Sequence, residues 1–255
     1  MITISSPEPA TADELLNQRS LVFLPEITET CAAISDVVES SIGRDELPVV
    51  LGGDHALAAG SVAGASRASR HLGLLWFDSH ADMNTPATSP SGHIHGMSLA
   101  VSMGMGDPEL TGLGGRTPKV DPKNVVLIGV RDLDPGERET LRSSGATIYT
   151  IREVDERGMR DVVHEAVRIA GTVTAGIHVS FDLDVIDPEE APGVGTAIAG
   201  GITYREAHLA MEILAESGKV VSVDLVEVNP VLEDRNQTAA LAVELTQSLL
   251  GKRIL

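Results

Sequence analysis

The sequence is poor in cysteine, in aromatic residues and in long apolar runs, and each shortage excludes a class of protein. A single cysteine, Cys31, cannot form a disulfide within the chain, which excludes a disulfide-stapled secreted domain. The N-terminus shows no basic and apolar signal-peptide pattern, so we expect a cytoplasmic location. No stretch approaches the roughly 20 apolar residues that a membrane-spanning helix needs.

Positive charge is also scarce, which argues against nucleic acid and membrane partners. The chain carries 37 acidic and 19 basic residues, giving a formal net charge of −18. Phosphate backbones and anionic lipids repel such a surface. Aromatic residues make up 2% of the chain, so few side chains are available to stack on bases. We therefore expect no nucleic acid and no membrane as partner, and the charge favours a small cationic substrate.

What the sequence does contain is a series of short apolar runs separated by helical patterns. Nearly continuous runs of this kind are typical of parallel strands that are covered on both faces. They lie at residues 48–51, 73–77, 125–130, 146–150, 177–181 and 220–226. Apolar spacing and capping residues predict helices at 24–43, after His55, and at 158–170, 203–218 and 236–250. We expect an α/β protein with three α/β/α layers around a mainly parallel sheet, formed by a single domain over residues 1–255.

Polar clusters follow five of the apolar runs. They are Gly-Gly-Asp-His at 52–55, Asp-Ser-His-Ala-Asp at 78–82, Arg-Asp-Leu-Asp at 131–134, Asp-Leu-Asp at 182–184 and Glu-Val-Asn-Pro at 227–230. One Asp after a strand is usually a turn residue or a helix cap. Open parallel sheets, however, bind ligands outside the carboxyl ends of their strands. Five clusters at that one edge therefore indicate a functional site.

The spacing within these clusters predicts a metal site. Side chains at i and i+2 of a strand end point the same way, so Asp78 with His80, and Asp182 with Asp184, can converge on one ion. The candidate ligands, enough for two ions, are His55, Asp78, His80, Asp82, Asp182 and Asp184. Carboxylates and imidazoles without a nearby thiolate favour Mn²⁺ over structural zinc, although Co²⁺, Fe²⁺ or Ni²⁺ can occupy the same ligands. Two adjacent ions suit hydrolysis of an unreactive carbon, such as that of a guanidinium group.

At these residues the chain resembles the arginases, in the ureohydrolase family of binuclear manganese enzymes. The resemblance lies between residues 47 and 250, in LGGDHALAAGS, WFDSHADMNTPATSPSGHIHGMSLA, VVLIGVRDLDPGE, VSFDLDVIDPEEAPGVGTAIAGGITYREA and VEVNPVLEDRNQTA. It implies hydrolysis of L-arginine to L-ornithine and urea by a metal-bridging hydroxide, with two Mn²⁺ per chain. It further implies a place in arginine metabolism or the urea cycle, and a homo-oligomer, either a trimer or a hexamer.

The resemblance also implies roles for individual residues. The six candidate ligands would hold the two ions, and Asp82 would belong to the catalytic set as well. His95 would be the proton shuttle, and Glu227 would lie near the guanidinium, with which a carboxylate can form two hydrogen bonds. The implied substrate-binding residues are Asn84, Ser89, Ser91 and His93 on an arginase-type loop, Asp134 with Glu137 for the ammonium group, and Thr196.

Three substitutions and the N-terminus depart from the arginase pattern. His93 stands where Asn is usual, Ser79 replaces the usual Ala, and Val185 replaces the usual Gly. We expect His93 to affect carboxylate recognition and Val185 to affect the room in the metal cleft. Residues 1–24 do not match the strand and Gly-rich segment with which arginases usually begin. The sheet is therefore expected to have fewer than the usual eight strands, with residues 48–51 near an edge that residues 20–24 partly cover.

Three alternatives stay open on the sequence alone. Another ureohydrolase, of the agmatinase, guanidinobutyrase or formiminoglutamase type, would use the same ligands. A non-catalytic arginase paralogue that binds metal or arginine would account for the divergent N-terminus, but retention of all six ligands with His95 and Glu227 argues against it. A zinc deacetylase would share the fold, but the second set of ligands and the loop at 84–95 argue against that reading.

Overall fold

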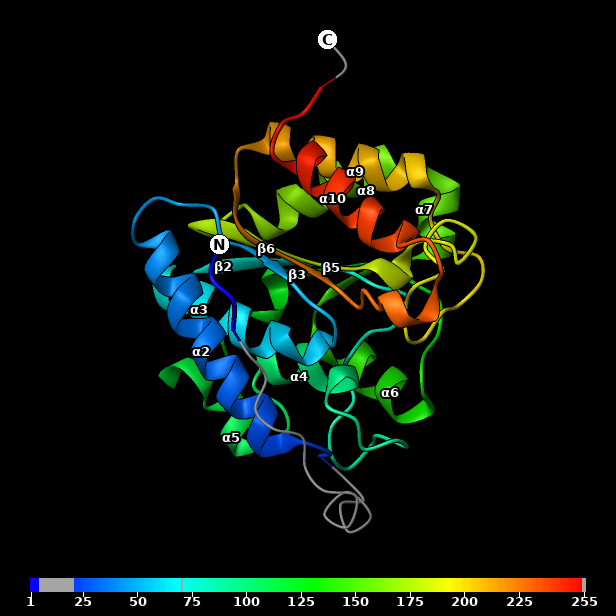
Figure 1. Cartoon of the computed structure of the whole chain (residues 1–255). Helices are drawn as coiled ribbons and strands as arrows, with labels where there is room; N and C mark the ends of the chain where they lie inside the picture. Colours follow the sequence, from blue (N-terminus) through cyan, green and yellow to red (C-terminus); the bar gives the residue numbers. More distant parts are fainter. Residues whose placement is uncertain (5–20, 70, 254–255) are drawn as a thin grey trace.

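A parallel sheet lies at the centre of the computed structural model, which describes residues 1–4, 21–69 and 71–253 (Figure 1). Within these residues the sheet has six strands in the order β1-β6-β5-β2-β3-β4, and every neighbouring pair is parallel. The strands are β1 (Val49–Leu51), β2 (Leu72–Phe77), β3 (Val125–Val130), β4 (Thr147–Thr150), β5 (Gly176–Asp182) and β6 (Val220–Val226). All six predicted strands are present, with ends that differ by at most one residue.

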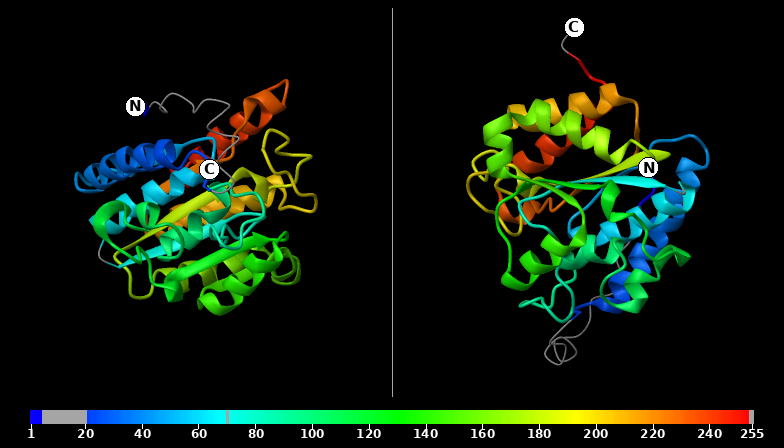
Figure 2. Two further views of the ribbon diagram at one scale, coloured as in Figure 1. Left: turned by 90° about the horizontal axis from the view of Figure 1, so that it is seen from below. Right: turned by 180° about the vertical axis from the view of Figure 1, so that it is seen from behind.

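Helices cover both faces of the sheet, as both further views show (Figure 2). One layer holds α2 (Leu24–Ile42), α3 (Ala58–Ala68), α4 (Ser98–Ser102), α5 (Pro108–Thr111) and α6 (Pro135–Ser144). The other holds α7 (Ile151–Arg157), α8 (Met159–Ala170), α9 (Tyr204–Ser217) and α10 (Gln237–Leu249). The predicted three-layer α/β/α fold is confirmed. No helix of the described residues is both long enough and apolar enough to cross a membrane.

The two faces of the sheet form separate parts of the hydrophobic core. Leu75 and Phe77 of β2 pack in the cluster under α8 and α9, whereas Leu74 and Trp76 pack in the cluster under α2 and α3. Neighbouring strand residues point to opposite faces of the sheet, and both faces are covered by helices. Every residue of β2, β3 and β5 is therefore buried. This double burial explains why these strands are continuous apolar runs in the sequence.

Two helices, α6 and α7, do not follow from apolar periodicity. Leu141 is the one buried apolar residue of α6, and Val154 is the one in α7. Both helices begin instead with a capping box, in which the N-cap residue and the Glu three positions later bond each other's backbone. The pairs are Asp134 with Glu137 and Thr150 with Glu153, so the sequence does carry a signal for both helices.

The strand β1 lies at one edge of the described sheet, as predicted, and the sheet has fewer than eight strands there. Leu51 is exposed at this edge, and Ile4 packs against the core cluster that also contacts Val50. Residues 5–20 lie outside the described part of the chain. The predictions are therefore untested over residues 5–20. Residues 21–24 do not bear out the predicted coverage of the edge, because Leu21 and Leu24 pack in the cluster of Cys31 and the Val22 N–H donates to the Gly92 carbonyl.

Candidate metal centre and active site

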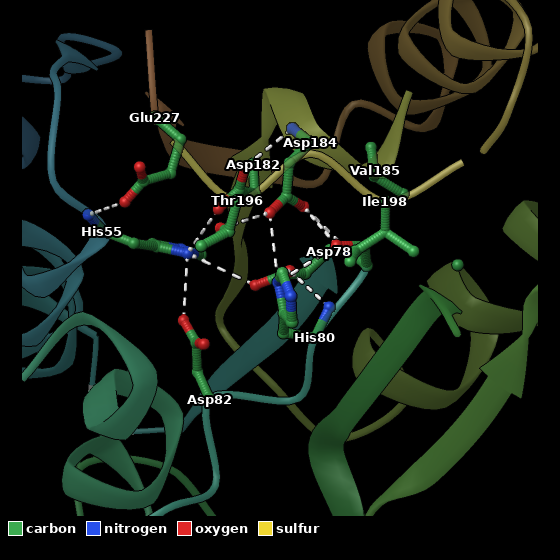
Figure 3. A network of polar contacts seen from close by, with 12 residues as sticks. His55, Asp78, His80, Asp82, Asp182, Asp184, Val185, Thr196, Ile198 and Glu227 are labelled. Atoms are coloured by element: carbon green, nitrogen blue, oxygen red, sulfur yellow. Dashed lines mark hydrogen bonds and ion pairs between the residues drawn. The ribbon is translucent and has the colours of Figure 1, made fainter. Parts of the chain in front are cut away.

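The ends of neighbouring strands bring the six predicted ligands together (Figure 3). They are His55 after β1, Asp78, His80 and Asp82 after β2, and Asp182 and Asp184 at the end of β5. Glu227 follows β6, which lies between β1 and β5. Short segments of 3-10 helix after β1 and β5 carry His55 and Asp184, so these side chains turn back over the strand ends. The predicted convergence at one edge of the sheet is thus present.

The first group of ligand atoms surrounds the imidazole of His55. Its Nδ1 atom lies 3.3 Å from Asp78 Oδ2, 3.0 Å from Asp82 Oδ2 and 3.1 Å from Asp182 Oδ2. These side chains are buried, and His55 Nδ1 and Asp82 Oδ2 have no hydrogen-bond partner within the described residues. Buried polar atoms without a partner are costly. A cation between them would satisfy these atoms, so this group, which we call the His55 group, fits a metal ion.

The second group surrounds His80 and shares a carboxylate with the first. The Nδ1 atom of His80 lies 3.1 Å from Asp184 Oδ2 and 3.5 Å from Asp78 Oδ1. Asp78 therefore turns one oxygen toward each histidine. In both triads, His55-Asp78-Asp82 and Asp78-His80-Asp184, the candidate ligand atoms lie within 4.8 Å of one another. This second set, which we call the His80 group, fits a second ion, and Asp78 belongs to both groups.

The pKa values indicate that both groups favour a positive charge. Burial lowers the pKa of His80, but hydrogen bonds and charge from Asp184 and Asp78 outweigh it and raise the pKa to about 12. Burial and the charge of Asp78 raise the pKa of Asp82 to about 8. Crowded carboxylates stabilise a cation beside them, whether it is a proton on the imidazole or a metal ion in its place.

Residues inside the sheet hold the His55 group. His55 Nε2 lies 2.8 Å from Ser180 Oγ, and the His55 ring stacks on Trp76 with 4.3 Å between ring centroids. Trp76 Nε1 also donates to Asp78 Oδ2 at 3.0 Å. Ser180 and Trp76 are not among the residues that the sequence predicted for the site. A signal was present, because each precedes a predicted ligand by two residues and therefore points to the same face of its strand.

Loop residues hold the His80 group, and one of them is a departure from the arginase pattern. Ser79 Oγ donates to Asp184 Oδ1 at 2.8 Å and lies 3.0 Å from His80 Nδ1. Thr196 Oγ1 donates to Asp184 Oδ2 at 3.3 Å. Val185 is fully buried in the core, where a Cβ atom at Gly129 would lie 2.4 Å from Val185 Cγ2. The hydroxyl of Ser79 thus contacts two of the three ligands of this group, His80 and Asp184.

Glu227 and His95 lie together beside the His55 group. Glu227 Oε1 accepts a hydrogen bond from the His55 backbone N–H at 2.8 Å and lies 3.9 Å from His95 Nδ1. Burial raises the pKa of Glu227 to about 7. Its φ of 62° is in the left-handed region, as is that of Asp82 at 51°, and non-glycine residues in this region concentrate at functional sites. The backbone conformation at these two residues therefore directs both carboxylates toward His55.

Three of the predicted substrate residues form one cluster at the start of α6. Asn84 Nδ2 donates to Asp134 Oδ2 at 2.9 Å. Glu137 is buried, and its two oxygens accept backbone N–H groups of Met83 at 3.0 Å and Asp134 at 3.2 Å. Glu137 therefore fastens the segment after Asp82 to α6. The Asp134 side chain accepts the backbone N–H of Glu137 in the capping box, and Asn84 Oδ1 accepts the hydroxyl of Thr88 at 3.0 Å.

The loop that carries the remaining predicted residues is organised by its own serines. Ser89 Oγ lies 3.4 Å from Ser91 Oγ and accepts the backbone N–H of Gly92, while Ser91 Oγ accepts that of His93. His93 is exposed, and its ring centroid lies 5.8 Å from that of His95. The loop thus places the serine hydroxyls and His93 on the same turn as the predicted shuttle residue.

Comparisons with known proteins identify the family. The model of the arginase family matches residues 12–251. The chain is 50% identical to an arginase of Bacillus caldovelox, over 93% of this chain and 78% of that protein. It is 46% identical to an arginase of Bacillus subtilis, over 97% of this chain and 83% of that protein. The crystal structure of the Bacillus caldovelox arginase superposes with a TM-score of 0.92 at 46% identity, over 98% of this chain and 83% of that one. This chain belongs to the arginase family.

Proposed function

We propose that this protein hydrolyses L-arginine to L-ornithine and urea. The observation that carries the proposal is the position of Glu227, whose carboxylate lies between the His55 group and the imidazole of His95. A partly buried carboxylate at the rim of a metal centre suits a planar guanidinium cation. Membership of the arginase family and about half identity to proteins named arginases support the same substrate. They do not favour the other ureohydrolases as alternatives.

We further propose that two Mn²⁺ ions occupy the His55 and His80 groups. The two imidazoles and four carboxylates of His55, His80, Asp78, Asp82, Asp182 and Asp184 would hold them, with Asp78 shared. Oxygen-rich ligands of this kind suit Mn²⁺. Ions held by these residues would lower the pKa of a bound water and so would supply a nucleophile at neutral pH.

The side chains around the centre would perform the remaining steps. Glu227 would orient the guanidinium through two hydrogen bonds, with its carbon facing the ligand cluster. The leaving amine must gain a proton as the C–N bond breaks. His95 is 27% exposed at its side chain and lies 3.9 Å from Glu227, so it can take a proton from solvent and deliver it beside the guanidinium.

Recognition of the amino-acid end is assigned to the loop at 84–95 and the start of α6. Asp134 would pair with the α-ammonium group, while Asn84, Ser89 and Ser91 would bond the α-carboxylate, with His93 beside them. The net charge of −18 favours a cationic substrate over long distances. We extend the proposal to a cytoplasmic homo-oligomer of single-domain chains, a trimer or hexamer, acting in arginine metabolism or the urea cycle.

Turnover measurements on four substrates test this function. We expect the Mn²⁺-loaded protein to hydrolyse L-arginine at least about 100-fold faster, as kcat/KM, than agmatine, guanidinobutyrate or formiminoglutamate, because buried polar groups left unpaired penalise analogues. A preference for agmatine would identify another ureohydrolase. Tight metal binding with no turnover on any substrate would identify a non-catalytic paralogue.

Two variants separate binding from chemistry. His95→Ala should retain two metal ions and lower kcat by about 10²- to 10⁴-fold, the range that general acid–base residues contribute. Glu227→Gln keeps the shape of the side chain but removes its charge, and it should chiefly raise KM. Unchanged turnover in His95→Ala would remove His95 from the mechanism.

A further inference from the structure

A pocket beside the 131–133 segment is separate from the metal ligands. Its volume is about 460 Å³, and it opens between α6 and the ends of β3 and β4. None of the six candidate metal ligands lines it. Apolar side chains form much of its wall, among them Leu133, Leu141, Ile148 and Ile151, and all but Leu141 are partly open to solvent. Pockets that bind small molecules are of this size and are mostly apolar, with a few polar groups.

The charged groups of this pocket are positive, in a chain that is strongly negative. Arg138 and Arg142, both exposed, line it from successive turns of α6. The described arginines that form ion pairs with carboxylates are Arg44, Arg67, Arg152, Arg157, Arg168, Arg205 and Arg253. Arg138 and Arg142 are not among them, although the chain has 37 acidic residues and 19 basic ones. Like charges four residues apart on a helix repel each other, and an anion between them would relieve this repulsion.

A third arginine separates the pocket from the metal centre. Arg131 lines the pocket, but its guanidinium donates to backbone carbonyls: Ile198 at 2.6 Å, Asp184 at 2.8 Å and Val185 at 3.1 Å. Its donors are thus engaged on the side of the His80 group. This leaves Arg138 and Arg142 as the groups that are free to bind a ligand from solvent.

We propose that this pocket binds a small organic anion. Its carboxylate would pair with the guanidinium groups of Arg138 and Arg142, which match carboxylate oxygens in geometry. Its apolar body would cover Leu133, Ile148 and Ile151 and remove their exposed surface from water. Two unpaired cations beside an apolar wall favour this class of ligand. An inorganic anion would leave the apolar side chains of the wall exposed to water.

A ligand in the pocket should affect metal binding in the His80 group; this inference rests on the proposed two-ion site. Arg131 contacts the pocket and also holds the backbone of Asp184, a candidate ligand of the His80 group. An anion close to Arg131 would draw its guanidinium toward the pocket and weaken its bonds to the carbonyls. We expect the bound anion to lower the affinity for the second Mn²⁺ ion.

Calorimetric titration of the Mn²⁺-loaded protein with 4-phenylbutyrate tests the binding. The uncharged 4-phenylbutanol and inorganic phosphate supply the apolar body and the charge separately. The variant Arg138→Gln/Arg142→Gln removes the two cations of the pocket. Its matched control, Arg160→Gln/Arg168→Gln, removes two exposed cations of α8 and changes the net charge by the same amount.

We expect saturable binding of 4-phenylbutyrate to the wild type and the control, at least tenfold weaker binding to Arg138→Gln/Arg142→Gln, and weaker binding of both partial probes. Equal affinity in the two double variants would overturn the proposal, because the probe would then bind elsewhere, for example in the active site. Phosphate binding as tight as that of 4-phenylbutyrate would overturn the apolar part. A change of oligomeric mass in Arg138→Gln/Arg142→Gln without probe binding would assign the surface to a second copy of the chain instead.

The coupling has a separate readout. Titration of the metal-free protein with Mn²⁺, with and without saturating 4-phenylbutyrate, should show a severalfold weaker second binding step with the anion present. An unchanged second step together with saturable binding would remove the coupling and leave the pocket as an anion site. If no Mn²⁺ bound at all, the proposed function would fail, and titration of the metal-free protein with 4-phenylbutyrate would still test the pocket.

Discussion

The His55 group and the His80 group share Asp78 but are held in place by different parts of the protein. The side chain of His55 is 1% exposed and is fixed by Ser180 and Trp76, which are direct partners in the pairing of β2 with β5. The side chain of His80 is 24% exposed and lies beside Ser79, while Thr196 bonds Asp184; both supporting residues come from loops. The register of the sheet therefore fixes the positions of the ligands in the His55 group. The positions of the ligands in the His80 group depend instead on how three loops pack together.

The ligands held by strands and those held by loops depend on different interactions. A ligand that is fixed by strand register keeps its position as long as the core is packed. Ligands on loops need additional bonds between the loops, and Arg131 supplies them by donating to carbonyls of the segments at 184–185 and at 198. Changes in the core and changes in the loops should therefore affect different ions.

Removal of the shared carboxylate should have the largest effect. Asp78→Ala takes one oxygen from each group, so we expect loss of both ions and a fall in activity of at least about 10³-fold, since two-ion chemistry fails without the ions. Elemental analysis after gel filtration measures the metal content, and circular dichroism checks the fold. Asp155→Ala, on the exposed face of α7, is the matched control.

His80→Ala gives the contrast with that result. It removes a ligand from the His80 group alone, so one ion should remain in the His55 group. If Asp78→Ala also kept one tightly bound ion, Asp78 would not be shared, and the two groups would be independent sites.

Loss of the arginine that joins the loops should have the next largest effect. Arg131→Met removes five hydrogen bonds to carbonyls. We expect about 10- to 100-fold weaker binding of the second ion, the usual cost of losing a residue that orients a ligand, with the first ion unaffected. Arg138→Met, which lines the same pocket without such bonds, controls for the loss of charge. Equal weakening of both ions would contradict the division between strands and loops.

The sequence predicts five of the six ligands because they are spaced by two residues, as side chains on one face of a strand are, and it predicts His55 from the Gly-Gly-Asp-His turn after a strand. It does not predict which residues lie behind them, because that depends on how separate strands align. Trp76 and Ser180 are partners across β2 and β5 and stand 104 positions apart in the chain. The carbonyl acceptors of Arg131, at 184, 185 and 198, are likewise distant in the sequence and come near it only in the folded chain. Apolar periodicity did not predict helix α6, because Leu141 is its one buried apolar residue and the helix is defined by its capping box and charged residues.

A matched pair of serine variants tests which residue supports each ion. Ser180→Ala removes the hydroxyl beside His55 Nε2, and Ser79→Ala removes the hydroxyl that bonds Asp184 Oδ1. A hydrogen bond of this kind contributes about 1 kcal/mol, so each change should weaken one ion by roughly fivefold. Ser180→Ala should act on the first Mn²⁺ ion and Ser79→Ala on the second, as stepwise Mn²⁺ titration would resolve. The reverse assignment would contradict the proposed supports.

Thr196 should give the smallest effect, because its bond to Asp184 Oδ2 is long, at 3.3 Å, and the residue is exposed. Thr196→Val keeps the volume and removes the hydroxyl, so we expect less than about threefold weaker binding of the second ion, in line with an exposed hydrogen bond. The sequence resemblance assigns Thr196 to the substrate instead, and KM separates the two roles. A contact to Asp184 alone leaves KM for arginine unchanged once Mn²⁺ is saturating. A rise in KM under that condition would show that Thr196 contacts the substrate. Thr196 would then link substrate binding to the His80 group through its bond to Asp184.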